Sequence, residues 1–255
     1  MSVLDLFRLD GRVALVTGAG RGLGQAMSVG LAEAGADIAG LDLIPLDETQ
    51  ARVEALGRRF LTVSCNLRDS SVRDLDETVR RVAGEMGRLD ILVNNAGIIR
   101  RAPVLEFSEA YWDDVIQIDL KALFFLSQAA GRVMVAQGGG KIISVASMLS
   151  FQGGILIPSY TAAKSGVAGL TRALANELAA QGINVNAIAP GYMATDNTAP
   201  LRADAERSKA ILSRIPVGRW GEPEDLKGVV VFLASAASDY MHGAIVPVDG
   251  GWLTR

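Results

Sequence analysis

Short apolar runs alternate with longer helical patterns along almost the whole chain, and this order limits the fold more than any other feature. The runs are rich in β-branched residues, which is typical of strands buried on both faces of a sheet. They cover residues 12–17, 37–42, 60–65, 90–94, 140–146, 183–189 and 244–248. Helical patterns cover 22 to about 34, 69 to about 86, a long stretch from 108, 158 to about 181, and a segment from Pro223. The alternation predicts βαβ units, and therefore an α/β fold with a doubly wound parallel sheet of about seven strands and helices on both faces.

We expect residues 1–255 to form a single domain, because no linker, short repeat or low-complexity segment divides them. The least regular stretch is 191–221, which is rich in Thr, Asn, Arg and Ala. A segment of that kind beside an active site often serves as a lid. We therefore predict a mobile substrate loop over this range.

Charge and residue usage exclude several classes of function. The chain has 25 Lys and Arg against 28 Asp and Glu, a formal net charge of −3, whereas nucleic acid and anionic membranes require a basic surface. No apolar stretch is long enough to span a bilayer, and the first residues lack the apolar core of a signal peptide. The lone Cys65 allows no intrachain disulfide, as is usual in a reducing compartment. We expect a cytoplasmic protein with no nucleic-acid or membrane partner.

The chain has one histidine, His242. A site built from several histidines is therefore impossible, and we expect no metal. A Ser-His-Asp hydrolase would depend on this residue as its base, and no Gly-x-Ser-x-Gly turn supports that interpretation. We interpret His242 as a loop residue, with a contact between subunits as the alternative.

Residues 17–24 read Thr-Gly-Ala-Gly-Arg-Gly-Leu-Gly and stand between the first strand and the first helix. Glycines let the backbone turn sharply and approach a pyrophosphate, and the helix N-terminus adds free N–H groups and a partial positive charge. A tight turn without a ligand is the other interpretation, but strand, glycines and helix come in the order of a dinucleotide site. We predict a Rossmann-type domain whose cofactor contacts include Gly18, Arg21, Gly22, Leu23 and Gly24.

Asp42 ends the second predicted strand, 18 residues after Gly24. A carboxylate there can accept hydrogen bonds from the adenosine ribose and repels a 2′-phosphate, which favours NAD over NADP. Arg21 favours the opposite choice, because a guanidinium near that ribose could pair with a phosphate. A solvent-facing position for Arg21 is an equal alternative, and the repulsion at Asp42 decides the prediction for NAD.

Tyr160 and Lys164 are four residues apart on a predicted helix and so share one face. An ammonium beside a phenol stabilises the phenolate and lowers the phenol pKa from about 10 toward neutrality. That change makes tyrosine a usable acid and base. Taken alone, the pair could also be a chance spacing on an exposed face.

Further motifs accompany this pair in a fixed order. They are Thr17, Gly22 and Gly24 in the glycine turn, Asn94-Asn95-Ala96-Gly97, Ser147 thirteen residues before Tyr160, and Pro190-Gly191. Together they resemble the short-chain dehydrogenase/reductase family over essentially the whole chain. The resemblance implies a nicotinamide-dependent oxidoreductase acting on CH–OH groups, in which Tyr160 exchanges a proton with the substrate and the cofactor exchanges a hydride.

The resemblance also implies a role for each matching residue. Ser147 would hold the substrate oxygen, while Lys164 would lower the pKa of Tyr160 and bind the nicotinamide ribose, and Asn94 would be structural. Further cofactor contacts would come from Asn95, Ala96, Gly97, Pro190, Gly191, Met193 and Thr195. Members of this family usually form tetramers, which implies a homotetramer with residues 108–136 and 158–181 packed between subunits.

Two positions depart from the family pattern. The long helix carries Asp119 where the family usually has an asparagine in its proton relay. Asp119 is thus a fourth catalytic candidate, which could still orient water but whose charge near Lys164 would change the electrostatics. Asn66-Leu67 stands where the family often has Asp and an aliphatic residue against the adenine, and Asn66 can still accept a hydrogen bond there.

Within the family, several stretches are similar to the group of 2-deoxy-D-gluconate 3-dehydrogenases and 2-dehydro-3-deoxy-D-gluconate 5-dehydrogenases. These stretches are 97–101, 146–154, 189–195 and 219–221. The similarity implies a small sugar acid with a secondary alcohol or ketone as the substrate. Arg100 and Arg101 are candidates to pair with its carboxylate, and we choose Arg101. Ser147, Gln152 and Tyr192 would bind its oxygens.

Two alternative functions remain. A 3-oxoacyl carrier protein reductase shares every catalytic motif but normally uses NADP, so Asp42 counts against it. A non-catalytic NAD-binding redox sensor would not need acid–base residues, so the intact Ser147, Tyr160 and Lys164 count against it.

Overall fold

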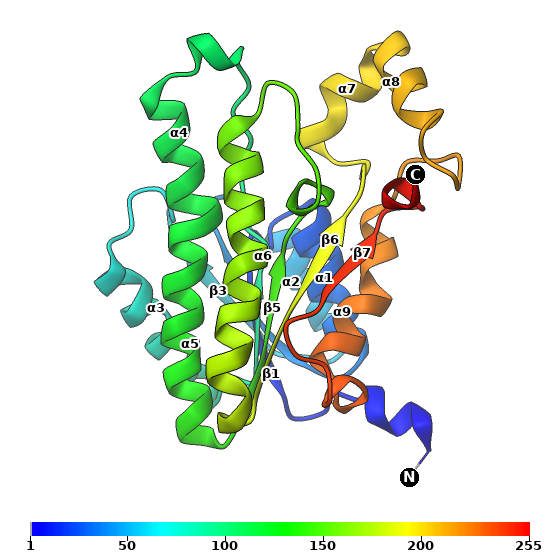
Figure 1. Cartoon of the computed structure of the whole chain (residues 1–255). Helices are drawn as coiled ribbons and strands as arrows, with labels where there is room; N and C mark the ends of the chain where they lie inside the picture. Colours follow the sequence, from blue (N-terminus) through cyan, green and yellow to red (C-terminus); the bar gives the residue numbers. More distant parts are fainter. Residues whose placement is uncertain (1) are drawn as a thin grey trace.

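The computed structural model describes residues 2–255 and contains a parallel seven-stranded sheet (Figure 1). The strand order is β3-β2-β1-β4-β5-β6-β7, and every neighbouring pair is parallel. The strands are β1 (Val13–Thr17), β2 (Asp37–Asp42), β3 (Phe60–Ser64), β4 (Ile91–Asn94), β5 (Gly140–Val145), β6 (Ile183–Pro190) and β7 (Ile245–Val248). The predicted fold class is confirmed, and each predicted strand boundary lies within one residue of the observed one.

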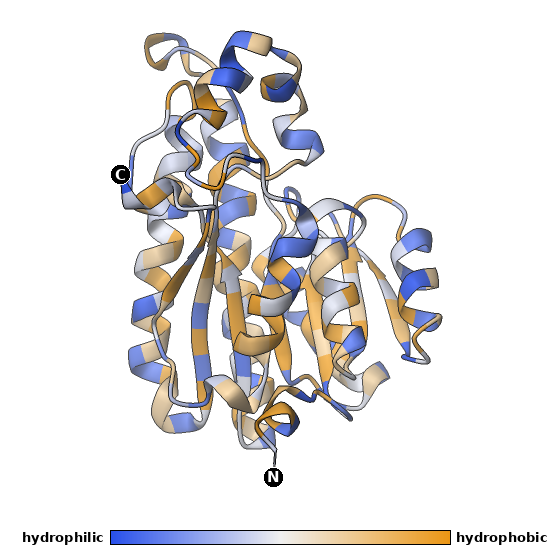
Figure 2. Cartoon of the chain, turned by 90° about the vertical axis from the view of Figure 1, so that its right-hand side faces the viewer, coloured by the Kyte–Doolittle hydropathy of each residue, from blue (hydrophilic) through white to orange (hydrophobic). Residues whose placement is uncertain are grey.

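Helices cover both faces of the sheet, as predicted. One face is covered by α1 (Gly22–Glu33), α2 (Asp47–Glu54) and α9 (Lys227–Ala234). The other is covered by α3 (Val72–Met86), α5 (Leu123–Gln137) and α6 (Pro158–Leu178). Figure 2 shows that most strands are hydrophobic along their length, whereas hydrophilic residues concentrate on the helices and connections. Along residues 2–255, no helix is both long and apolar enough to cross a membrane.

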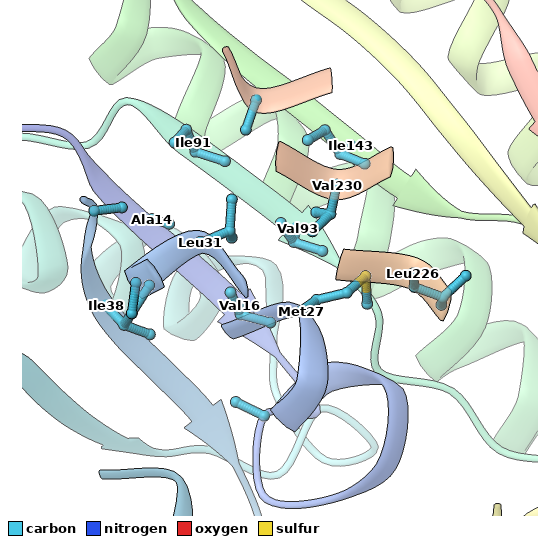
Figure 3. Close-up of a cluster of buried hydrophobic side chains, with 14 of the residues drawn as sticks. Ala14, Val16, Met27, Leu31, Ile38, Ile91, Val93, Ile143, Leu226 and Val230 are labelled. Carbon is cyan, nitrogen blue, oxygen red and sulfur yellow. The ribbon is translucent and has the colours of Figure 1, made fainter. Parts of the chain in front are cut away.

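The two faces of β1 contribute to two separate cores, because successive side chains of a strand point to opposite faces. Ala14 and Val16 pack with Met27 of α1 on one face (Figure 3). Val13 and Leu15 belong to the opposite core, with residues of α3 and α5. Since both faces are covered, the run is apolar throughout, and this made the strand visible in the sequence.

The long helix predicted from Ser108 is interrupted by a π-helical stretch. The Ser108 hydroxyl accepts a hydrogen bond from the Tyr111 N–H at 3.2 Å and so caps α4 (Glu109–Ile116). The π-helical stretch η3 (Gln117–Ala122) then joins α4 to α5. Such stretches are frequent at functional sites, and this one carries the buried Asp119.

Two short helices that the sequence did not predict lie within the 191–221 segment, and the rest of the segment is mostly without regular structure. They are α7 (Ala199–Ala203) and α8 (Ala205–Leu212), which project beyond the carboxyl ends of the strands (Figure 1). Neither has an apolar stripe of the length that reveals a helix in a sequence. Ile211 of α8 packs against Met148 and Trp252. The mobility of the segment stays a prediction.

Candidate active site

A cavity of about 550 Å³ lies where the order of strands changes direction, between β1 and β4. Most of the predicted cofactor residues line it, namely Gly18, Arg21, Gly22, Leu23, Asp42, Asn66, Leu67, Asn95, Ala96, Gly97, Tyr160, Lys164 and Thr195. Neighbours that the sequence did not single out complete the wall, among them Ile44, Cys65, Val145 and Asp196. The remaining predictions, Gly24, Pro190, Gly191 and Met193, are not lining residues in this structure, and their roles stay predictions.

The glycine turn has the backbone of a phosphate cradle. Gly22 has φ +56° where α1 begins, a conformation that favours glycine. Gly24 lets the Gly18 carbonyl pack directly against α1, since a Cβ at Gly24 would lie 1.9 Å from the Gly18 carbonyl oxygen. The Asn95 side-chain amide donates to the carbonyl oxygens of Thr17 at 2.9 Å and Gly18 at 3.1 Å. These contacts hold the first turn of α1 at the cavity wall, where its N–H groups can bind a phosphate.

Backbone N–H groups fix the Asp42 carboxylate at the end of β2. Its Oδ2 accepts from the Gly20 N–H at 2.8 Å and its Oδ1 from the Leu43 N–H at 2.7 Å. Arg21 lies in the same wall, but its Nη1 pairs with Asp196 Oδ2 at 2.6 Å. Both partners of that pair are exposed, so the pair contributes about 0–1 kcal/mol and can open for a ligand.

Two elements carry the acid–base candidates. Helix α6 begins at Pro158 and presents Tyr160 and Lys164 on one face. The Lys164 Nζ donates to the Val145 carbonyl oxygen at the end of β5, at 2.9 Å, and lies 5.4 Å from the centre of the Tyr160 ring. Ser147 follows the same strand, is buried, and its side chain stabilises the phenolate form of Tyr160. The structure therefore places Tyr160 and Lys164 in the cavity wall, with Ser147 next to them after the end of β5.

Asp119 reaches this cluster from η3. Its side chain is fully buried, and its Oδ1 accepts a hydrogen bond from the Ile98 N–H at 2.8 Å. Its Oδ2 lies 3.4 Å from the Lys164 Nζ. Gly97 leaves room for this carboxylate, because a Cβ at Gly97 would lie 2.7 Å from Oδ2. Asp119 is therefore a direct neighbour of Lys164, as its sequence position suggested.

Lys164 acts on the pKa of Tyr160 in the predicted direction, but other groups oppose it. Burial raises the pKa of the phenol, Lys164 lowers it and Asp119 raises it again, so the pKa lies above its ordinary value. Burial lowers the pKa of Lys164, but Asp119 and Tyr160 outweigh that effect and the pKa is raised. Burial also raises the pKa of Asp119, against the opposing effects of Lys164 and the Ile98 N–H.

The structure separates the two arginines that follow the Asn95-Ala96-Gly97 turn. Arg100 pairs with Asp114 at 2.8 Å, and its guanidinium lies 5.7 Å from the centre of the Tyr111 ring, so it has a structural role. Arg101 is exposed and donates to the Asn197 carbonyl oxygen at 3.1 Å. It also stabilises the phenolate of Tyr160. Of the two arginines, Arg101 is therefore the one without a carboxylate partner in residues 2–255, and its charge lowers the pKa of Tyr160.

Aromatic residues share an apolar cluster with Tyr160. The Tyr192 ring stands edge-on to those of Trp220 and Trp252, with ring centres 5.4 and 4.8 Å apart. These rings and Tyr160 belong to one apolar cluster, which also contains Ile211 of α8. Gln152 is half-buried, and its side chain makes no hydrogen bond within residues 2–255.

The comparisons with known proteins agree with this geometry. Residues 18–253 match the family model described as enoyl-(acyl carrier protein) reductase. The chain is 59% identical to 2-dehydro-3-deoxy-D-gluconate 5-dehydrogenase of Escherichia coli, over 99% of this chain and 100% of that protein. The chain belongs to the short-chain dehydrogenase/reductase family. It is therefore an oxidoreductase that acts on CH–OH groups with a nicotinamide cofactor, as the motifs implied.

Solved structures of other dehydrogenases of this family have the same fold. A putative 2-deoxy-D-gluconate 3-dehydrogenase from Agrobacterium tumefaciens, with bound NADP, is 56% identical with a TM-score of 0.92, over 98% of this chain and 100% of that one. A gluconate 5-dehydrogenase from Burkholderia cenocepacia, in complex with NADP and tartrate, is 38% identical with a TM-score of 0.94, over 100% of both chains.

Two contacts of this dehydrogenase were missed by the sequence reasoning. Asp196 pairs with Arg21 across 175 positions, and the only signal for it was its place directly after Thr195. The Ile98 N–H binds Asp119, and no side-chain pattern announces a backbone donor. Both depend on the tertiary fold.

Proposed function

We propose that this enzyme interconverts a secondary alcohol and a ketone on a small sugar acid of the 2-dehydro-3-deoxy-D-gluconate type, with NAD as its cofactor. The observation that carries the proposal is the full-length similarity to 2-dehydro-3-deoxy-D-gluconate 5-dehydrogenases, and the exposed Arg101, whose charge lowers the pKa of Tyr160, would be the partner of the substrate carboxylate.

A nicotinamide cofactor supplies or takes up the hydride when it is bound. The residues of the site fit that group: the glycine turn would hold its phosphates, Asp42 its adenosine ribose, and Lys164 its nicotinamide ribose. An ammonium has three donors, and the Val145 carbonyl and the Asp119 carboxylate take two of its directions. The third direction is left for a ribose hydroxyl.

The chain's own residues perform the proton transfer. In the reduction, Ser147 would position the substrate carbonyl, and Tyr160 would give its phenol proton to the carbonyl oxygen as the carbon gains the hydride. The product is a secondary alcohol, and Tyr160 regains its proton from solvent. In the oxidation, Tyr160 as phenolate would remove the hydroxyl proton while the carbon loses the hydride.

A substrate panel tests this function. We expect turnover of 2-dehydro-3-deoxy-D-gluconate or 2-deoxy-D-gluconate, measured by the change in NADH absorbance. Much faster turnover of a neutral steroid or an acyl thioester would overturn the proposal, and the thioester would then favour the 3-oxoacyl carrier protein reductase.

Arg101→Gln is expected to raise KM for the sugar acid by roughly 10- to 100-fold, because a charge-assisted hydrogen bond contributes about 1.5–3 kcal/mol. KM for NAD should stay unchanged. Steady-state kinetics give both constants. Arg100→Gln is the matched control, since Arg100 is held by Asp114 and should affect stability more than KM. Equal effects of the two substitutions on KM would contradict the assignment.

Asp42→Ala is expected to raise kcat/KM for NADP relative to NAD by roughly 10-fold or more, because it removes a negative charge from the position of the 2′-phosphate. Three solved relatives contain bound NADP, so the preference of this enzyme for NAD over NADP needs a direct measurement. Kinetics with both cofactors decide it, with Asp37→Ala at the opposite end of β2 as the control. A wild-type enzyme that clearly prefers NADP would contradict the assignment of NAD.

A homotetramer is part of the proposal, on the strength of the family resemblance. The first segment expected to pack between subunits forms α4, η3 and most of α5, and the second forms α6; α5 and α6 lie side by side on one face of the sheet (Figure 1). The ring centres of Phe124 and Phe125 on α5 are 5.1 Å apart, and both rings are half-buried, which leaves part of each surface for a neighbour.

A further inference from the structure

Asp119 places a negative charge in the catalytic centre where the family pattern has a neutral side chain. The carboxylate is fully buried, and its position is fixed by the Ile98 N–H at 2.8 Å on Oδ1. The Lys164 Nζ lies 3.4 Å from Oδ2. The charge therefore cannot turn away into solvent.

The contacts favour the ionised form of this carboxylate. Both groups beside it, the Ile98 N–H and the Lys164 ammonium, are donors. A proton on Oδ2 would need an acceptor, and neither of these two donors offers one. A carboxylic acid would therefore bury an unsatisfied hydroxyl, whereas the carboxylate gains an ion pair.

Three charged side chains act on Tyr160, and each comes from a different element. Lys164 lies on the same helix and Arg101 on the loop after β4, and both favour the phenolate. Asp119 lies on η3 and opposes the phenolate. The ion pair between Asp119 and Lys164 thus offsets part of the stabilisation that the ammonium gives to the phenolate.

We propose that the Asp119 carboxylate keeps Tyr160 protonated at neutral pH. It thereby extends into the alkaline region the pH range over which this site donates a proton to a ketone. Asp119 is a positioning residue in this role, because it acts on the reaction through Lys164 and through its own charge. The kinetic part of the inference rests on the proposed function, while the titration of Tyr160 does not.

Asp119→Asn tests the proposal, because the amide keeps an acceptor for the Ile98 N–H and removes the negative charge, with an NH2 group in the place of Oδ2. In the wild type, kcat/KM for ketone reduction should fall at alkaline pH as Tyr160 loses its proton. In the variant this fall should move to lower pH by about one unit. The rise of kcat/KM for alcohol oxidation should move by the same amount in the same direction, because one group governs both profiles.

A second measurement needs no substrate. The ultraviolet absorbance of the phenolate gives the titration of Tyr160 as the difference between a protein and its Tyr160→Phe counterpart. This difference titration should also move about one pH unit lower when Asp119→Asn is introduced. If no sugar acid is turned over but the titration moves, the proposed function fails and this inference stands.

Asp114→Asn is the matched control. Asp114 is a second buried carboxylate on the same long helix, but it pairs with Arg68 and Arg100. It should leave both pH profiles and the titration in place, although it should lower stability. An unchanged titration of Tyr160 in Asp119→Asn, or a shift to higher pH, would overturn the proposal. A rise in KM with no movement of the pH profile would assign Asp119 a purely structural role.

Discussion

Tyr160→Phe is expected to lower kcat by roughly 10²- to 10⁴-fold, because it removes the phenol that gives its proton to the substrate in the proposed mechanism. The apolar ring is retained, and Tyr160 packs in the cluster with Met148 and Tyr192, so the fold should be preserved. The Kd for NAD should change little, since the glycine turn and Asp42 are untouched. Steady-state kinetics and fluorescence titration with NADH measure the two quantities.

The same substitution separates an enzyme from a redox sensor. A sensor would bind the cofactor equally well with either residue and would show no turnover to lose. Tyr240→Phe is the control, because Tyr240 is fully exposed and does not line the cavity. A Tyr160→Phe variant that kept the wild-type kcat would place the proton transfer on another group and remove the basis of the proposed mechanism.

The strands were predictable because the sheet is covered on both faces. Each strand had to be apolar throughout, and that pattern survives in the sequence without knowledge of the fold. The helices that were not predicted from the sequence lack such an apolar pattern, because they bury few residues. Helix α2 buries only Thr49 and Val53, and α8 buries only Ile211, so neither leaves a periodic apolar signal.

The site was predictable where its chemistry uses local spacing. Tyr160 and Lys164 are one helical turn apart, and the glycine turn is continuous in the sequence. The electrostatic balance was not predictable, because it depends on groups that only the fold brings together. Asp119 lies 45 residues before Lys164 in the sequence. It reaches the site from a π-helical stretch, which the hydrophobic periodicity of the sequence does not predict.

Lys164→Met is expected to destabilise the protein by about 3–5 kcal/mol, because it leaves the Asp119 carboxylate buried without its cation. The loss should also depend on pH. Burial raises the pKa of Asp119 in the folded state, and removal of Lys164 raises it further. The folded variant then holds a proton that the unfolded chain releases, so its free energy of unfolding should fall as pH rises above the ordinary pKa of an aspartate. Urea unfolding at pH 5.5 and pH 8 measures the difference.

The double variant Lys164→Met/Asp119→Asn distinguishes a buried-charge effect from simple loss of packing. With the carboxylate gone, most of the stability lost in Lys164→Met should return, together with its pH dependence. Catalysis should not return, because the ammonium that holds the nicotinamide ribose and favours the phenolate is still missing. A double variant as unstable as Lys164→Met would show that the aliphatic packing of Lys164, and not the pairing with Asp119, stabilises this part of the site.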